Sequence, residues 1–330
     1  MSQALHYPWF ESRWAHMVEQ CSGGRLPHAL LLAGPAGIGK QDFATTLGNY
    51  LLCQAPANGQ PCGRCHSCEL RQAGSHPDFI QVSPEGPGKP IKVDQVRELI
   101  DHLHSTAQQG GYRVVVLEPA ESLNTSSANA LLKILEEPGE DTLLVLISHQ
   151  PGQLMPTIRS RCQRIDFAVP PAPDAIAWLS TALGLPQEKS EQLLAIAHGA
   201  PLRARDLYQG DAMDQRKQLL TGLADLLRDR VSASELATKL TKCDLLNCLD
   251  WLASLLNDVI RMQMTHSDQP RVNRDMKRML EAVAKQGSRV KIFQMSDRIQ
   301  EERVSLMLRQ NPNRQLLLET LLQQWSALIR

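Results

Sequence analysis

Short apolar runs alternate with amphipathic patterns through the first half of the chain. Three of these runs are rich in Leu and Val and short enough to predict buried strands: 28–33, 114–117 and 143–147. Apolar residues at helical spacing separate the runs, over 40–53, 93–107 and 126–137. Because strands that alternate with helices form parallel sheets, the first half predicts an α/β fold.

The stretch from Val169 to Pro173 contains three prolines, ends this alternation and predicts a domain boundary. Beyond it the sequence carries almost no strand signal. We expect a small helical unit up to about residue 208, and helix after helix from there, as in 244–262 and 314–329. The pattern therefore predicts an α/β domain and two all-α domains, over 1–168, 169–210 and 211–330.

Composition and charge exclude several classes of protein. With 330 residues, of which 42% are hydrophobic, the chain can bury a sizeable core, so wholesale disorder is excluded. Lys+Arg and Asp+Glu both total 35, which disfavours a protein that binds nucleic acid alone, because counterion release needs a basic surface. The sequence has no apolar run of about 18 residues, so we expect no membrane contact and a cytoplasmic location.

A phosphate-binding pattern directly follows the first apolar run. The segment from Gly34 to Lys40 fits G-x-x-x-x-G-K and stands between a predicted strand and a predicted helix. Its glycines, Gly34, Gly37 and Gly39, let backbone N–H groups turn toward phosphates, and Lys40 would neutralise the phosphate oxygens. The sequence therefore predicts a nucleotide-binding loop.

Two positions of this nucleotide site depart from a hydrolytic pattern. Gln41 stands where a Ser or Thr hydroxyl would bind Mg²⁺, and its longer side chain suits octahedral coordination poorly. Glu118, after the second apolar run, can still place a carboxylate near Mg²⁺. Pro119, however, occupies the position of the residue that polarises the attacking water. Binding of ATP and Mg²⁺ stays open, whereas we expect no hydrolysis in cis.

Half of the eight cysteines crowd into sixteen positions, at Cys53, Cys62, Cys65 and Cys68. In a reducing cytosol such a cluster indicates a metal site, and four thiolates predict a closed, structural zinc site. Iron–sulfur ligation and free thiols are the alternatives. His66 and His76 lie nearby, and we expect both to be surface residues rather than ligands.

Two arginines, Arg159 and Arg161, follow the third apolar run after a short loop. They could form a solvated edge, and the residues alone favour this interpretation. A planar, permanently charged guanidinium could also stabilise phosphate in the ATP site of a neighbouring subunit.

Four segments, taken in order, resemble one protein family over residues 1–170. They are Gly34–Lys40, the cysteine insert, the run from Ser127 to Pro138, and Ser160-Arg-Cys162, and they resemble bacterial clamp-loader subunits of the AAA+ class. Tyr7-Pro-Trp9 and the altered hydrolysis residues are similar to those of a family member that acts mainly as a stator. The resemblance implies an AAA+-type P-loop domain with a zinc insert at about 53–68, then a helical lid and a helical collar.

The resemblance also implies a function in an assembly. In this family five subunits form a ring that uses ATP to open a sliding clamp and place it on primed DNA. Other clamp-loader subunits, the clamp and DNA are therefore the expected partners. Arg161 would act in trans in the ATP site of an adjacent motor subunit, and Arg159 would belong to the local structure. An active ATPase motor subunit and a zinc-stabilised nucleic-acid-binding module are the alternatives.

Three further features are less informative. Ser148 or His149 would be the sensor-like polar residue after the third strand. Arg203 resembles the phosphate-sensing arginine of the lid but is displaced by one residue, which is about 100° of helical rotation. The stretch 271–291 is rich in Lys and Arg, and we expect a solvated helix face rather than a surface for DNA or a partner.

Overall fold

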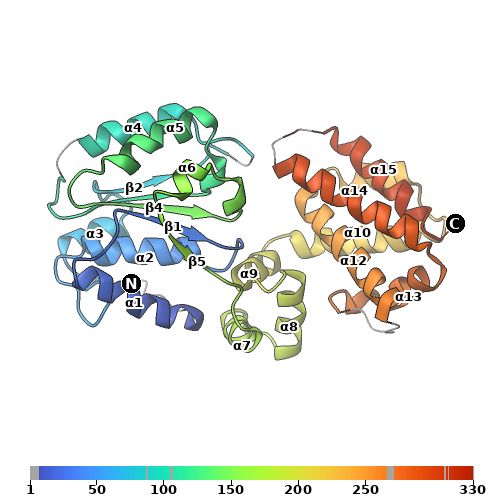
Figure 1. The fold of residues 1–330 in the computed structure, drawn as a ribbon. Helices are drawn as coiled ribbons and strands as arrows, with labels where there is room; N and C mark the ends of the chain where they lie inside the picture. The colour runs from blue at the N-terminus through green and yellow to red at the C-terminus, as the bar shows by residue number, and fades with distance from the viewer. Residues whose placement is uncertain are drawn as a thin grey trace. The chain divides into compact units, whose positions relative to one another are not determined.

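The computed structural model describes residues 7–86, 88–104, 107–265, 271–307, 310 and 312–329. The chain divides into two compact units, an α/β unit over Met1–Trp178 and a helical unit over Leu179–Arg330 (Figure 1). The predicted α/β fold with a parallel sheet and a P-loop segment, followed by helices, is confirmed. The division into three domains at 168 and 210 stays a prediction. Within the described ranges, every helix is too short or too polar to span a membrane.

Five parallel strands form the sheet of the first unit, in the order β2-β3-β4-β1-β5. Their bounds are β1 Ala29–Ala33, β2 Phe79–Val82, β3 Arg113–Leu117, β4 Thr142–Ser148 and β5 Gln163–Asp166. The apolar runs predicted as strands are the central strands β1, β3 and β4, and every residue in them is buried. Strands covered on both faces carry continuous apolar sequence, which is why the hydrophobic pattern revealed these three.

The edge strands β2 and β5 carry no comparable signal. In β2 only Phe79 and Val82 are buried, and β5 has the mostly exposed sequence Gln-Arg-Ile-Asp. Pairing with β1 defines β5, because Leu32 lies opposite Ile165 in a parallel register. Both edge strands therefore depend on a neighbour rather than on their own hydrophobic pattern.

Helices cover both faces of the sheet (Figure 1). One face carries α4 (Val93–His104), α5 (Thr125–Glu136) and α6 (Pro156–Arg159), and the other carries α1 (Glu11–Ser22), α2 (Lys40–Leu52) and α3 (His66–Gln72). Helix α7 (Ala172–Leu183) begins at the end of this unit. On the α4/α5 face, Leu31, Val115 and Leu144 form one buried cluster with Val96 and Leu131. Truncation of such a leucine to alanine typically costs about 2–5 kcal/mol.

The carboxyl ends of the central strands lie together at the C-terminal end of the sheet. The register places Ala33 of β1 opposite Ser148 of β4, and Leu117 of β3 opposite Leu146. The residues that follow these three strands therefore leave the sheet at its C-terminal end, which is where open parallel sheets bind ligands. The fold thus brings the phosphate-binding loop, Glu118 and His149 into one site.

The described part of the second unit is helical. Its helices are α8 Gln187–Ile196, α9 Pro201–Gln209, α10 Ala212–Leu226, α11 Ala233–Leu240, α12 Leu245–Thr265, α13 Lys277–Gln286, α14 Arg289–Met307 and α15 Arg314–Ser326. Helix α12 packs against α10, α13 and α14, and α15 packs against α10, α11 and α14. Leu249, Leu252 and Leu256 on α12 are fully buried, so this long helix forms the centre of the unit.

Candidate functional site

The phosphate-binding loop leaves β1 and enters α2 under tight steric constraint. Gly34, Gly37 and Gly39 have φ values of 155°, 74° and 101°. A Cβ atom at Gly34 would lie 2.0 Å from the carbonyl oxygen of Phe167, and one at Gly39 would lie 2.8 Å from the Tyr7 ring. These two positions accept only glycine, because any side chain would clash and the backbone is in the positive-φ region.

The ammonium group of Lys40 is buried and binds acceptors of its own chain. Lys40 is 3% exposed, and its Nζ donates to the carbonyl oxygens of Gly34 and Pro35, both at 2.6 Å. A third bond runs to Nδ1 of His149 at 3.0 Å. Because a lysine ammonium has three donors, the protein itself satisfies all of them.

Burial shifts the pKa values of the groups around Lys40. It lowers the pKa of Lys40 to about 8, against the opposing charges of Glu118 and Glu121. It raises the pKa of Glu118 to about 7, which Lys40 partly counteracts, and lowers the pKa of His149 to about 4. Near neutral pH His149 is therefore uncharged and can accept the proton of Lys40 in a hydrogen bond.

His149 connects Lys40 with two acidic side chains. Since Nδ1 accepts from Lys40, the hydrogen-bond network assigns the ring proton to Nε2, which lies 3.6 Å from Oε1 of Glu118. The backbone N–H of His149 donates to Oε1 of Glu121 at 3.0 Å, and Oε2 of Glu121 is buried without a hydrogen-bond partner. Ser148 is buried, and its hydroxyl accepts a backbone N–H two residues on, at 3.2 Å. Of the two sensor-like candidates, His149 is thus the one that contacts Lys40.

Aromatic residues before α1 bind the same loop. Nε1 of Trp9 donates to the carbonyl oxygen of Ile38 at 3.1 Å, and the hydroxyl of Tyr7 donates to Oδ2 of Asp42 at 2.6 Å. The rings of Tyr7 and Trp9 stack with centroids 5.1 Å apart, and Trp178 meets both edge-on. Local sequence patterns do not predict these hydrogen bonds, because their partners are 29 and 35 positions apart.

The residues of the loop do not fit a Mg²⁺-ATP site. Gln41 is exposed, and no hydroxyl stands at its position to bind Mg²⁺. The donors of Lys40 are committed to the chain's own acceptors. Pro119 carries no group that could polarise a water molecule. No hydrolytic step follows from this arrangement.

The four cysteines predicted as metal ligands form one cluster. Cys53 follows the last residue of α2, Cys65 precedes α3 (His66–Gln72), and Cys68 lies within that helix. All four Sγ atoms lie within 4.8 Å of one another, and Cys53–Cys65 and Cys62–Cys68 are both 4.0 Å apart. Zn–S bonds of about 2.3 Å would place tetrahedral sulfur ligands about 3.8 Å apart, so the cluster fits a structural zinc ion.

The two nearby histidines differ. His66 is exposed as expected, but the expectation that His76 is a surface residue is wrong, because it is 4% exposed. Its Nε2 lies 2.8 Å from Oγ of Ser67, which donates to the carbonyl oxygen of Leu52 at 2.6 Å. Its Nδ1 accepts the backbone N–H of Asp78 at 3.1 Å. His76 therefore supports the backbone on either side of the cysteine insert.

Arg161 lies at the surface and is paired within its own chain. Nη2 of Arg161 is 2.6 Å from Oε1 of Glu136, and Nη1 donates to the carbonyl oxygen of Thr157 at 3.0 Å. The neighbouring Cys162 is buried in the core, whereas the Arg161 side chain stays 36% exposed. Within the described residues Arg159 forms no ion pair. Local sequence does not reveal Glu136 as the partner of Arg161, because Glu136 lies 25 positions earlier, at the end of α5.

Arg203 is bound inside the helical unit. Its Nη2 lies 2.5 Å from Oδ2 of Asp250, and Oδ1 of the same carboxylate is 2.6 Å from Nη2 of Arg303. Asp250 is buried, and its carboxylate, which is shielded from water, is shared by the two guanidinium groups. Arg203 therefore joins α9 to α12, which is a structural contact rather than a contact with phosphate.

The basic stretch 271–291 is partly neutralised by acidic neighbours. Arg274 pairs with Glu191 at 3.2 Å, and Lys277 pairs with Glu281 at 3.7 Å. The first pair is exposed and the second is partly exposed, and ion pairs at the surface contribute little to stability. This arrangement favours the expected solvated helix face.

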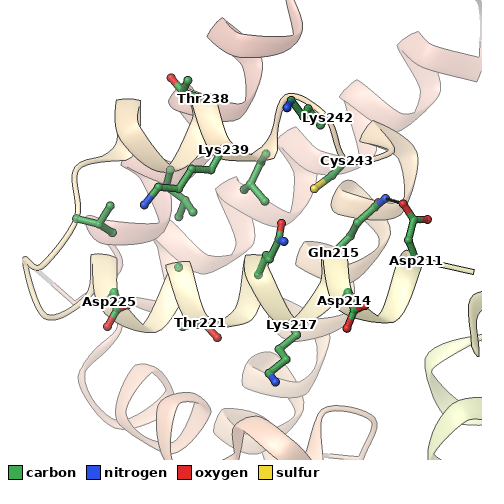
Figure 2. Close-up of a pocket in the computed structure, with 15 residues that line it drawn as sticks. Asp211, Asp214, Gln215, Lys217, Thr221, Asp225, Thr238, Lys239, Lys242 and Cys243 are labelled. Atoms are coloured by element: carbon green, nitrogen blue, oxygen red, sulfur yellow. Dashed lines mark hydrogen bonds between the residues drawn. The ribbon is translucent and has the colours of Figure 1, made fainter.

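A groove of about 1040 Å³ lies between α10 and α11 and contains none of the predicted site residues (Figure 2). Acidic and basic side chains line it in equal number: Asp211, Asp214, Asp225, Lys217, Lys239 and Lys242. Gln215 donates to Asp211 at 2.8 Å within the groove. The balanced charge favours neither an anionic nor a cationic ligand.

Comparisons with known proteins find relatives along nearly the whole chain. The family model for the DNA polymerase III delta subunit matches residues 10–171, and the model for the C-terminal part of that subunit matches residues 210–327. DNA polymerase III subunit delta' of Pseudomonas aeruginosa is 42% identical over 325 residues, 98% of each chain. The subunit delta' of Yersinia pestis is 37% identical over 326 residues, 97% of this chain and 95% of the relative. DNA polymerase III subunit gamma/tau of Mycobacterium bovis is 33% identical over 202 residues, 61% of this chain and 34% of that protein.

Replacement of Cys62 by serine should remove a bound metal and destabilise the α/β unit, because a structural zinc contributes folding free energy directly. We expect about one zinc per wild-type chain by elemental analysis, much less in Cys62→Ser, and a lower melting temperature for the variant. Cys21→Ser, outside the cluster, is the matched control. A brown sample, or a Cys62→Ser protein with full zinc content, would contradict the assignment.

His149 should make the protein less stable in acid. Its pKa of about 4 in the folded state lies below the ordinary value of 6.5, so between these values the unfolded chain binds more protons. The free energy of unfolding therefore falls as the pH drops from 6.5 to 4, by at most about 1.4 kcal/mol per pH unit. Unfolding in urea gives the free energy of unfolding of the wild type and of His149→Asn at each pH in this range. Because Glu118 titrates in both proteins, its contribution largely cancels in the difference between the two free energies.

The exposed His66 provides the control for this experiment, and His66→Asn should follow the wild type at every pH. If the free energies of unfolding of the wild type and of His149→Asn differ by the same amount at every pH, His149 is not held neutral by its surroundings.

Proposed function

This chain belongs to the DNA polymerase III subunit delta' family, and we propose that it is a subunit of the clamp loader that places a sliding clamp on primed DNA. Its partners in this proposal are the delta and gamma/tau subunits, in a five-subunit ring in the cytoplasm. Support comes from the delta' relatives, which match the chain over nearly its full length, and from the gamma/tau relative. The predicted domains 1–168, 169–210 and 211–330 would be the AAA+-type module, the lid and the collar that joins the ring.

Within that ring we assign the chain the role of a largely non-hydrolysing stator. The observation that carries this assignment is the closed hydrogen-bond network of Lys40, whose donors go to Gly34, Pro35 and His149. ATP would have to displace these acceptors to reach the ammonium group. At Gln41 and Pro119 the chain offers neither the hydroxyl ligand for Mg²⁺ nor the group that activates water. The loop therefore stabilises the fold without a working nucleotide site.

The contribution of the chain to ATP hydrolysis would be made in trans by Arg161. The buried Cys162 fixes the segment, and the guanidinium next to it stays partly exposed. Its present contacts, to one carboxylate and one carbonyl oxygen, are of a kind that phosphate oxygens can replace. An arginine supplied by a neighbour stabilises the charge that develops on the transferring phosphoryl group.

The cysteine cluster would hold zinc as a structural element of the AAA+-type module. Four thiolates leave no coordination position open, so the ion would take no part in the reaction. It would fix the loop between α2 and α3, as the buried His76 does from the other side.

Arg161→Ala in a reconstituted clamp loader should reduce ATP turnover at the adjacent site. A lost arginine finger costs ~10³–10⁵ in rate in related phosphoryl-transfer systems. Because other sites of the ring stay intact, we expect a loss of about tenfold or more in turnover stimulated by clamp and primed DNA, measured by phosphate release. The assembly itself should form normally.

Arg159→Ala is the matched control, since this arginine is two residues away and forms no ion pair in the described part of the chain. Equal turnover by the wild-type and Arg161→Ala complexes would refute the role in trans. Equal losses in both variants would point to a general defect of the segment instead.

A further inference from the structure

Among the residues that the structure describes, Glu136 is the acidic side chain that pairs with Arg161. It is the last residue of α5, and its Oε1 lies 2.6 Å from Nη2 of Arg161. A second guanidinium nitrogen donates to the carbonyl oxygen of Thr157. The two contacts together fix the plane of the guanidinium group, because its donors diverge in a rigid fork.

The position of Glu136 on α5 makes this pair more than an incidental surface contact. The C-terminal end of a helix carries partial negative charge, so a carboxylate there is disfavoured unless a cation lies beside it. Arg161 supplies that cation. If Arg161 moves to another partner, the Glu136 carboxylate is left without a cation at the negative end of α5, so the new partner must bind Arg161 more strongly than Glu136 does.

The pair is also exposed enough to be exchanged. The side chains of Arg161 and Glu136 are 36% and 51% exposed, and ion pairs in water are weak. The phosphates of a nucleotide carry more negative charge than one carboxylate and match the guanidinium fork equally well. Phosphate and Glu136 are thus alternative partners for the same donors, with phosphate the stronger of the two.

We infer that Glu136 is a positioning residue that holds Arg161 until the phosphates of a nucleotide on a neighbouring subunit displace it. This inference rests on the proposed role of Arg161 in trans. It adds that the arginine is withheld from the neighbour by a competing carboxylate, so ATP must be present before the finger is released. Glu136 would then set the ATP concentration at which the adjacent site works, and would leave its maximal rate unchanged.

Glu136→Gln in the reconstituted clamp loader tests this inference by a split between KM and kcat. The amide keeps the shape of the side chain but loses the charge that competes with phosphate. The KM for ATP of clamp-stimulated turnover should fall about two- to fivefold, the range expected from the strength of an exposed ion pair. The kcat should stay within about a factor of two, and the difference in KM should shrink as salt is added.

Glu137→Gln is the matched control. It removes the same charge one residue away, from an exposed side chain that forms no ion pair with any described residue, and it should leave KM unchanged. In an Arg161→Ala background, Glu136→Gln should have no further effect, because the competing group has lost its partner. Circular dichroism of each variant checks that α5 is intact.

The outcomes separate this inference from the proposed function. An unchanged KM in Glu136→Gln, combined with a strong loss in Arg161→Ala, would refute the competition and leave the role of Arg161 in place. A loss of kcat in Glu136→Gln would also refute it, since the carboxylate would then assist the reaction rather than compete with phosphate. Normal turnover by Arg161→Ala would remove the proposed function itself.

Discussion

The burial of the Lys40 ammonium among acceptors of its own chain is the interaction on which the rest of this protein depends. A buried charge is costly unless each of its donors is satisfied. In nucleotide-binding loops phosphate oxygens meet this need, whereas here two carbonyl oxygens and His149 do. The same glycines and lysine that make the loop recognisable thus stabilise it as a closed structure, which Tyr7 and Trp9 cover from the N-terminal side.

A closed loop changes how the chain can take part in ATP chemistry. Its own site holds a neutral histidine, a carboxyl group with a raised pKa and a proline in place of the hydrolytic machinery. The arginine of the Ser-Arg-Cys segment stays partly exposed, beside a buried cysteine and paired with Glu136. In the proposed function this arginine is the group that would reach a neighbour. Arg203 in the helical unit is likewise committed, since it is paired with Asp250. These contacts suit the proposed role, in which the chain supplies a group to the site of a neighbouring subunit.

The sequence predicted those parts whose signal is local. The central strands are continuous apolar runs, the loop has its glycines at fixed spacing, and the cysteines stand close together, so each could be found without a structure. The contacts that decide how the site works join distant positions. Lys40 and His149 are 109 residues apart, and the bonds of Tyr7 and Trp9 reach across about 30. The expectation for His76 is wrong for a different reason. Its partners Ser67 and Asp78 are close in sequence, but the burial of the ring arises only in the folded chain.

The most direct test of the account is ATP turnover by the purified chain, with and without primed DNA, together with equilibrium binding of ATP. The closed network of Lys40 predicts no turnover under either condition and no saturable binding. Lys40→Ala should then leave turnover unchanged at zero while it lowers the stability of the protein. Steady turnover by the wild-type chain that disappears in Lys40→Ala would contradict the account, since the chain would then be a motor in its own right.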